Sequence, residues 1–194
     1  MASASPRRLE LLHQIGVNFE VIVPEIDESV QAGEDPGKYV CRMALEKALA
    51  VQQRLKTFHA VLGADTAVII DDRILGKPVD RAQAIEMLLD LSGRTHEVWS
   101  AVALVFADGR ILDGLSISRV TFAPLSRVWI EGYCDSGDPM DKAGAYAVQG
   151  KAAQKISRLE GSYSGVMGLP IFETSEILME AGLLNSFESN LCLK

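Results

Sequence analysis

The feature that most constrains the fold is a nearly continuous apolar run, VLGADTAVII, which occupies residues 61–70. A strand with one face in water alternates apolar and polar side chains, and this run does not alternate. It therefore predicts a strand that is covered on both faces by other elements. Asp71-Asp72-Arg73 marks a turn directly after it.

Asp65 is the charged exception inside this run. A carboxylate in such a place must be paired, bound to a metal or shifted in pKa, because an unpaired buried charge is costly. The structural alternative is an aspartate at a strand end that caps a neighbouring helix or turn. We favour a functional role for Asp65, since perturbed carboxylates concentrate at functional sites.

The rest of the chain alternates between strand and helix patterns. We expect strands at 19–23, 96–106, 111–122 and near 153–159, with a hairpin at Asp108-Gly109. We expect helices at 36–55, after caps at Asp80 and Ser126, and from Pro170, with a glycine-rich loop at 161–168. Hairpin and crossover connections both occur, which predicts an α/β fold with a mixed sheet and flanking helices. Residues 1–184 form one expected domain, and 185–194 a loose tail.

Composition narrows the classes of function. The 194 residues carry a formal charge of −7, which argues against a general nucleic-acid binder. No apolar stretch approaches the roughly 20 residues that span a bilayer, and no signal-peptide pattern opens the chain. Cys41, Cys134 and Cys192 are few and odd in number, which indicates a reducing cytoplasm rather than a disulfide scaffold.

The opening segment, residues 3–8, has the composition of an anion-binding helix N-terminus. Ser5 is a good N-cap, and Pro6 suits the first helical position. Free backbone N–H groups, the helix dipole and the guanidinium groups of Arg7 and Arg8 would together attract a phosphate chain. The alternative is a capped surface helix with two solvated arginines.

Four further polar residues suit the same chemistry, and each has a plainer alternative. Lys47 falls on the apolar stripe of its helix, where it either snorkels to water or faces an anion inward. Lys77, on a rigid turn before a proline, is a phosphate ligand or an exposed loop lysine. Glu28 is a solvated loop charge or, with Asp65, a ligand of a divalent cation. Gln149 closes a turn or reads a base edge through its paired donor and acceptor.

Taken together, these residues supply the requirements of phosphoanhydride hydrolysis, and the chain resembles the Maf family of nucleoside triphosphate pyrophosphatases. The matching segments are ordered along nearly the whole chain: Ala2-Ser3-Ala4-Ser5-Pro6-Arg7-Arg8, Glu46-Lys47-Ala48, Gly63-Ala64-Asp65-Thr66, Leu75-Gly76-Lys77-Pro78, Leu91-Ser92-Gly93-Arg94-Thr95-His96, Asp141-Lys142-Ala143-Gly144-Ala145-Tyr146, Gln149-Gly150, Glu160-Gly161-Ser162-Tyr163-Ser164 and Val166-Met167-Gly168-Leu169-Pro170.

The resemblance implies an inosine-triphosphatase-like fold with two lobes around a deep cleft, and a cytoplasmic homodimer. Within the family, the chain is similar to the branch that acts on dTTP and UTP, which carries Gly-Ala-Asp-Thr and a glutamine like Gln149. The branch that acts on 7-methyl-GTP has serine before the aspartate, glutamine after it, and glutamate at the position of Gln149. Family members also place a short apolar strand before Ala2, where this sequence has only Met1.

The resemblance also implies roles for individual residues. Asp65 matches the proton acceptor, and the specificity positions match Arg7, Thr66 and Gln149. The residues associated with phosphate and metal handling match Arg8, Glu28, Lys47 and Lys77. We therefore expect water to attack the α-phosphorus and release pyrophosphate, with Mg²⁺ or Mn²⁺ held partly by Glu28 and Asp65 and with the N–H groups after Ser5 on the triphosphate.

Two other functions stay open at this point. The family has been linked to arrest of septum formation, so the chain could act by binding a cell-division protein, without catalysis. Such a module needs an exposed apolar patch, and none stands out in the sequence. A pyrophosphatase for another nucleotide, such as 7-methyl-GTP, is the second alternative.

Overall fold

The computed structural model describes residues 1–55 and 59–185. At its centre is a five-stranded sheet in the order β2-β1-β3-β4-β5, in which every neighbouring pair is antiparallel. The strands are β1 (Val61–Ile70), β2 (Arg73–Leu75), β3 (Thr95–Val105), β4 (Ile111–Phe122) and β5 (Ile156–Glu160). The helices are α1 (Pro6–Gln14), α2 (Pro36–Leu55), α3 (Arg81–Leu91), α4 (Arg127–Asp135), α5 (Tyr163–Met167) and α6 (Ile171–Glu180), with 3-10 turns η1 (Ala143–Ala145) and η2 (Lys151–Lys155).

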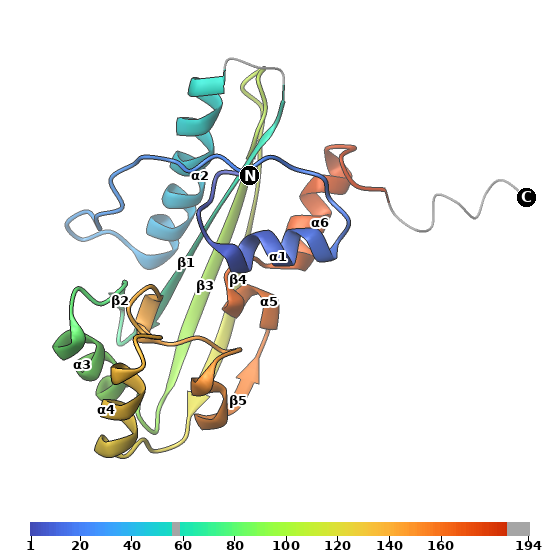
Figure 1. Cartoon of the computed structure of the whole chain (residues 1–194). Coiled ribbons are helices and arrows are strands. Elements are labelled where there is room, and N and C mark those ends of the chain that lie inside the picture. Colours follow the sequence, from blue (N-terminus) through green and yellow to red (C-terminus); the bar gives the residue numbers. More distant parts are fainter. Residues whose placement is uncertain (56–58, 186–194) are drawn as a thin grey trace, which may run out of the picture.

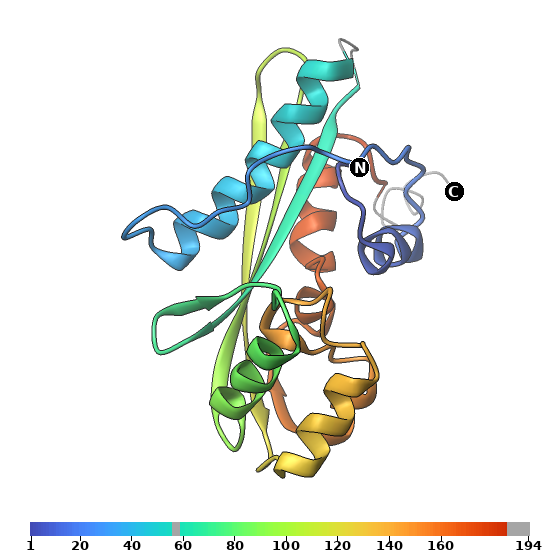
Figure 2. The ribbon, with the colours of Figure 1, turned by 60° about the vertical axis from the view of Figure 1, so that its left-hand side comes forward.

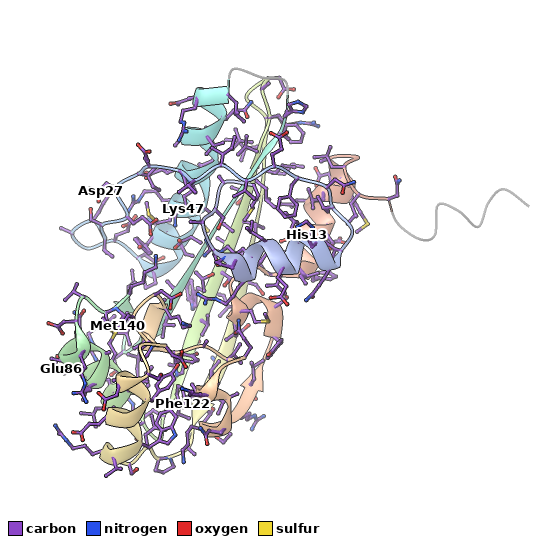
Figure 3. The ribbon with its side chains drawn as sticks, in the orientation of Figure 1. His13, Asp27, Lys47, Glu86, Phe122 and Met140 are labelled. Carbon is purple, nitrogen blue, oxygen red and sulfur yellow. The ribbon has the colours of Figure 1, made fainter. Side chains whose placement is uncertain are left out.

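Helices cover both faces of the sheet, as Figures 1 and 2 show. On one face α2 packs with Ala67, Ile69 and Ala101. On the other face α1 and α6 pack on Leu62 and its neighbours at one end of the strands. The helices α3 and α4 pack at the other end of that face around Phe122 (Figure 3). The α/β prediction with flanking helices is confirmed, as is the prediction that β1 is covered on both sides. We expected a mixed sheet, and within the described residues parallel pairing is confined to isolated bridges of Ala2, whereas the five strands pair antiparallel.

The contact between α2 and β1 depends on Gly63. A Cβ atom at this position would lie 2.2 Å from the Ala44 carbonyl oxygen and 2.8 Å from the Ala48 backbone nitrogen. Both are backbone atoms, so no side-chain rotation relieves the clash. The glycine therefore lets the helix backbone lie directly on the strand, two residues before Asp65.

Replacing Gly63 with alanine should destabilise the protein by about 1–3 kcal/mol, because the helix must lift off the strand. Urea unfolding measures the change. Gly132→Ala is the matched control, since a Cβ there meets nothing within 4 Å and alanine is the better helix former in α4. Equal effects of the two substitutions would contradict the close-packing argument.

The outer edge of β1 is interrupted. β2 pairs with residues 68–70, and at the other end Ala2 forms parallel bridges to Gly63 and Ile22. Between these attachments, residues 64–67 have no strand beside them on this edge in the described part of the chain. A cavity lined by Asp65 and Thr66 opens at this gap.

Three local predictions are wrong. Residues 19–23 do not form a strand of the sheet, because their only strand-type pairing within the described residues is a single bridge from Ile22 to Ala2. The last strand begins at Ile156 rather than near residue 153, since η2 precedes it. The glycine-rich loop contains α5, which Ser162 caps by accepting a hydrogen bond from the Gly165 N–H.

Two further sequence-based expectations concern the chain's end and the membrane. Of the predicted loose tail at 185–194, all but residue 185 lies outside the described residues. No helix among those described is both long and apolar enough to cross a lipid bilayer.

Candidate active site

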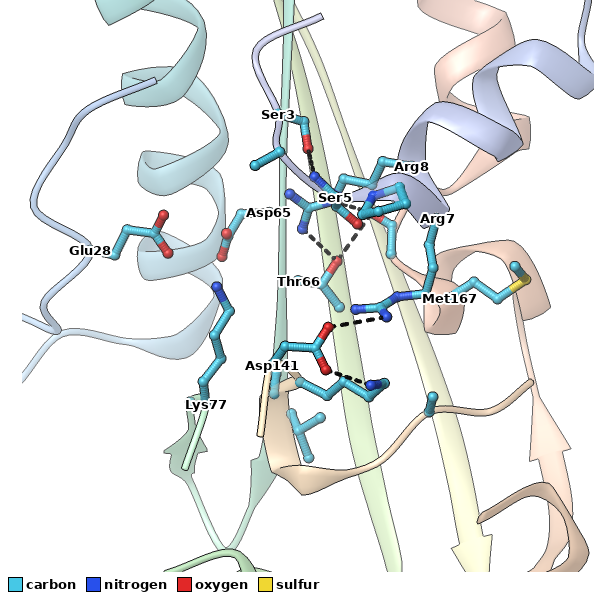
Figure 4. Close-up of a pocket in the computed structure, with 18 of the residues that line it drawn as sticks. Ser3, Ser5, Arg7, Arg8, Glu28, Asp65, Thr66, Lys77, Asp141 and Met167 are labelled. Carbon is cyan, nitrogen blue, oxygen red and sulfur yellow. Dashed lines mark hydrogen bonds and ion pairs between the residues drawn. The ribbon is translucent and has the colours of Figure 1, made fainter. Parts of the chain in front are cut away.

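The residues singled out in the sequence come together in space. All nine of them line one cavity of about 550 Å³, which opens at the interrupted edge of β1 (Figure 4). They are Ser5, Arg7, Arg8, Glu28, Lys47, Asp65, Thr66, Lys77 and Gln149. Because the strand alternates, Asp65 faces α2 and Thr66 faces the opposite side of the sheet. The gap in the edge lets one cavity reach both.

A buried ion pair forms one end of the cavity. The Lys47 Nζ donates to Asp65 Oδ1 at 2.6 Å and lies 3.1 Å from Glu28 Oε1. Lys47 and Asp65 are 5% and 6% exposed, whereas the Glu28 side chain is about half exposed. The lysine therefore faces inward, as one reading of its stripe predicts, and Asp65 is paired.

The helix α2 also fixes the loop that carries Glu28. The Tyr39 hydroxyl donates to the Glu28 backbone oxygen at 3.0 Å, and Arg42 donates to the Ser29 backbone oxygen at 3.1 Å. Arg42 also forms two hydrogen bonds to Glu34, which lower the pKa of that carboxyl to about 2. The loop backbone at Glu28 and Ser29 is thus held from one helix.

The N-terminal segment supplies the facing wall. Pro6 begins α1 and Ser5 is its N-cap residue, but the Ser5 side chain makes no capping hydrogen bond. Instead the Ser5 N–H donates to Ser3 Oγ at 3.1 Å. The predicted cap position is therefore right, and the capping is not made by the Ser5 hydroxyl. Arg7 points into the cavity, where its Nη1 lies 3.6 Å from Asp141 Oδ2 (Figure 4).

Arg8 joins three segments of the protein. It donates to the Gly168 oxygen at 2.8 Å, to the Ala64 oxygen at 2.7 Å and to Thr66 Oγ1 at 3.3 Å. Burial lowers the pKa of this guanidinium and the charge of Asp65 opposes that shift, but an arginine stays protonated. Three of its five N–H groups therefore serve the fold, and two have no partner among the described residues and are available to a ligand.

Thr66 belongs to the same polar network. Its hydroxyl is 3.0 Å from Ser100 Oγ and 3.3 Å from the Gly168 oxygen, in addition to its contact with Arg8. The buried Ser100 in turn donates to the Gly165 oxygen at 2.6 Å. This network fixes the floor of the cavity, where α5 approaches β1 and β3.

Lys77 and Gln149 reach the cavity from loops, on the side of the molecule that carries α3 and α4. Lys77 is exposed and points toward Asp65 and Glu28 in Figure 4. The loop of Lys77 is tied to the loop of Gln149, because the Gly144 N–H donates to the Gly76 oxygen at 3.1 Å. Gln149 is also exposed on the cavity wall.

Sequence reasoning gave no role to several residues that line this cavity, among them Tyr39, Asp141, Lys142 and Tyr146. The only signal was their place in segments that match the family or on the apolar stripe of α2. Tyr146 is itself anchored from behind, since its hydroxyl lies 2.7 Å from Nε2 of the buried His96.

His96 makes stability depend on pH. Burial lowers the pKa of its imidazole from 6.5 to about 4, and its Nδ1 has no partner among the described residues. Between these values the unfolded chain takes up a proton that the folded chain does not, so stability falls as the pH falls from 6.5 to 4. The loss should reach about 3 kcal/mol at pH 4.

Urea unfolding as a function of pH measures this effect. His96→Asn removes the titrating ring, so the slope of stability between pH 4 and 6.5 should become shallower in the variant. Identical slopes in the two proteins would assign the pH dependence to other groups.

The donor set is compatible with a divalent metal that arrives with a phosphorylated ligand. Glu28 and Asp65 both contact the Lys47 ammonium, so both carboxylates face one point of the cavity. Within residues 1–55 and 59–185, no group of three or more His, Cys, Asp or Glu side chains could hold a metal alone. One or two carboxylates completed by phosphate oxygens and water are the usual protein site for Mg²⁺.

Comparison with known proteins agrees with this geometry. A family model described as Maf-like protein matches residues 1–181. A dTTP/UTP pyrophosphatase of Burkholderia lata is 50% identical over 192 residues, covering 93% of this chain and 91% of its own. Proteins of the same name from Methylobacillus flagellatus and Xanthomonas campestris pv. campestris are 50% and 49% identical, each covering 94% of this chain and 92% and 97% of their own.

One solved structure is more distantly similar to this chain. A nucleoside-triphosphatase, dITP/XTP pyrophosphatase from Mycobacterium abscessus is similar over 99% of this chain and 96% of its own, at 16% identity and a TM-score of 0.41, which is too low to carry a conclusion. The match of the family model along residues 1–181 and the three relatives near 50% identity are decisive: the chain belongs to the Maf-like protein family.

Proposed function

We propose that the chain is a nucleoside triphosphate pyrophosphatase that hydrolyses dTTP and UTP to the monophosphate and pyrophosphate. One observation carries the proposal. A buried carboxylate, a second carboxylate and the Lys47 ammonium meet at one end of a cavity large enough for a nucleotide, and Lys77 points toward them. The names of the relatives near 50% identity support the same substrates.

In this proposal a water molecule attacks the α-phosphorus, and the bond to the oxygen that bridges the α- and β-phosphates breaks. Asp65 orients the water and accepts its proton, and pyrophosphate leaves with the bonding electron pair. Lys47 holds Asp65 Oδ1 at 2.6 Å, which fixes the position of the carboxylate and leaves Oδ2 for the water. A proton acceptor positioned in this way contributes about 10²–10⁴-fold to a rate.

Cations and backbone donors would bind the triphosphate. Lys77 points toward the carboxylates, and Arg7, the remaining donors of Arg8 and the N–H groups that follow Ser5 lie across the cavity. Mg²⁺ or Mn²⁺, held by Glu28 and Asp65 with phosphate oxygens, would neutralise charge on the phosphates. Thr66 and Gln149 face the nucleoside.

Pyrophosphate release from a nucleotide panel tests the proposal. The panel is dTTP, UTP, CTP, GTP and 7-methyl-GTP, each with Mg²⁺ or Mn²⁺ and with EDTA as the metal-free control. We expect turnover mainly of dTTP and UTP, and only with the metal. Preference for 7-methyl-GTP would overturn the substrate assignment, and absence of turnover on all five would favour the role of a binding protein for a cell-division partner.

The resemblance extends the proposal to the assembly and its place in the cell. We expect a homodimer in the cytoplasm, and the exposed side chains of Ile111, Leu115 and Ile117 on β4 are an apolar surface that a second copy can cover. Light scattering coupled to size-exclusion chromatography measures the mass. A monomer at micromolar concentration would contradict the expected dimer without touching the proposed chemistry.

A further inference from the structure

An aspartate between two cations lies at the end of the cavity away from the Lys47 ion pair. Asp141 Oδ2 is 3.6 Å from Arg7 Nη1, and its Oδ1 accepts a hydrogen bond from the Lys142 ammonium. Lys142 also donates to the Asp138 backbone oxygen, which fixes the ammonium beside the carboxylate. Figure 4 shows Asp141 pointing at Arg7 across the cavity. Nothing in the proposed hydrolysis uses this carboxylate.

The walls around Asp141 suit a nucleobase rather than a phosphate. Apolar and aromatic side chains of one cluster line the cavity there, from β1, β3, α5 and the loop that follows Asp141: Val68, Val98, Tyr146 and Val166. Flat apolar surface with a few placed polar groups is typical of a site for an uncharged ring. Glu28, Asp65 and Lys77 lie toward the other end (Figure 4), where the proposed function places the phosphates.

The protonation state of Asp141 makes it a pure acceptor. Burial raises the pKa of this carboxyl, but the hydrogen bond from Lys142 and the charges of Lys142 and Arg7 outweigh burial and hold the pKa below its usual range. An ionised carboxylate only accepts hydrogen bonds, whereas an ammonium and a guanidinium only donate them. The three side chains therefore present donor, acceptor and donor in sequence.

We propose that Asp141, between Arg7 and Lys142, determines base specificity by accepting the N3–H of uracil and thymine. The imide edge of these bases offers acceptor, donor and acceptor, which complements the three side chains. Cytosine has an unprotonated N3, whose lone pair would face the carboxylate, so the same site rejects it. This inference rests on the proposed function, assigns Arg7 to the base edge rather than to the triphosphate, and leaves the Gln149 amide for a base oxygen.

Asp141→Asn tests the assignment, because an amide can donate to the N3 of cytosine as well as accept from the N3–H of uracil. We expect the ratio of kcat/KM for dTTP to that for dCTP to fall by at least about tenfold, the range of a hydrogen bond to a charged group. If Asp141 only holds Arg7 and Lys142 in place, both nucleotides lose activity equally and the ratio stays unchanged, which overturns the proposal. Asp135→Asn, exposed on α4 and outside the cavity, is the matched control.

A binding measurement separates this inference from the proposed hydrolysis. Calorimetry with the α,β-imido analogues of dUTP and dCTP should show tighter binding of the dUTP analogue to the unmodified chain, and a reduced difference in Asp141→Asn. Preference in binding without any turnover would sustain the base-reading role and sink the catalytic proposal. Turnover of dTTP with equal affinity for both analogues would support the catalytic proposal and overturn the base-reading role of Asp141.

Discussion

Replacing Asp65 with asparagine is expected to lower kcat for pyrophosphate release from dTTP by about 10²–10⁴-fold, with little change in KM. Asparagine keeps the shape of the side chain and cannot accept the proton of the attacking water. Lys47 keeps its contact with Glu28 at 3.1 Å, so the ammonium is not left without a partner and the chain should fold. Steady-state kinetics measures the effect.

Two controls bound this first prediction. Asp113→Asn removes an exposed carboxylate on β4, outside the cavity, and should leave kcat unchanged. Thermal unfolding of Asp65→Asn checks that the fold survives. Turnover within about tenfold of the unmodified chain, a change of only about 1.4 kcal/mol in barrier, would show that Asp65 is not the base.

Lys47→Met should cause the largest loss of stability, about 3–5 kcal/mol. The substitution leaves Asp65, 6% exposed, as a buried charge whose nearest cation has gone. Methionine fills a similar volume, so the loss reflects charge rather than packing. Urea unfolding at neutral pH measures it, with Lys38→Met on the exposed side of the same helix as the matched control.

A double substitution separates charge from packing. Lys47→Met with Asp65→Asn removes both charges, and the pair should be markedly more stable than Lys47→Met alone, because the stranded carboxylate is gone. If the double variant is no more stable than the single one, the lysine stem rather than its charge holds α2 against β1.

The elements that the sequence predicted well are those whose periodicity and burial agree. The apolar stripe of α2 is compatible only with a helix, and the apolar run of β1 only with a buried strand. Both elements form at the expected residues. The strand predicted at 19–23 does not form, although its apolar side chains pack, for example Phe19 against the His13 ring with the ring centroids 4.5 Å apart. The backbone of this segment does not join the hydrogen-bond ladder of the sheet. Apolar content reports burial, and only neighbouring backbone makes a strand.

For the site, residue type and family pattern identified the polar groups that line the cavity. They did not predict which of their hydrogen bonds serve the fold and which remain for a ligand. Arg8 was expected on phosphate and spends most of its donors on the fold, which follows from the approach of Gly168 and Ala64. Asp141 and Arg7 are far apart in the sequence, so their pairing depends on a tertiary approach that no local pattern encodes. Such contacts between distant segments are what single-sequence reasoning cannot supply.

The continuity of the long strands has a mechanical consequence. β1, β3 and β4 contain 10, 11 and 12 residues, about 33–40 Å of strand at 3.3 Å per residue, and they run as continuous strands from one half of the molecule toward the other (Figure 2). A hinge motion of one side of the cavity relative to the other would have to bend this hydrogen-bonded sheet. We therefore expect the sheet to stay rigid. Movement of the surface loops at 24–35 and 136–150 should control nucleotide entry and product release.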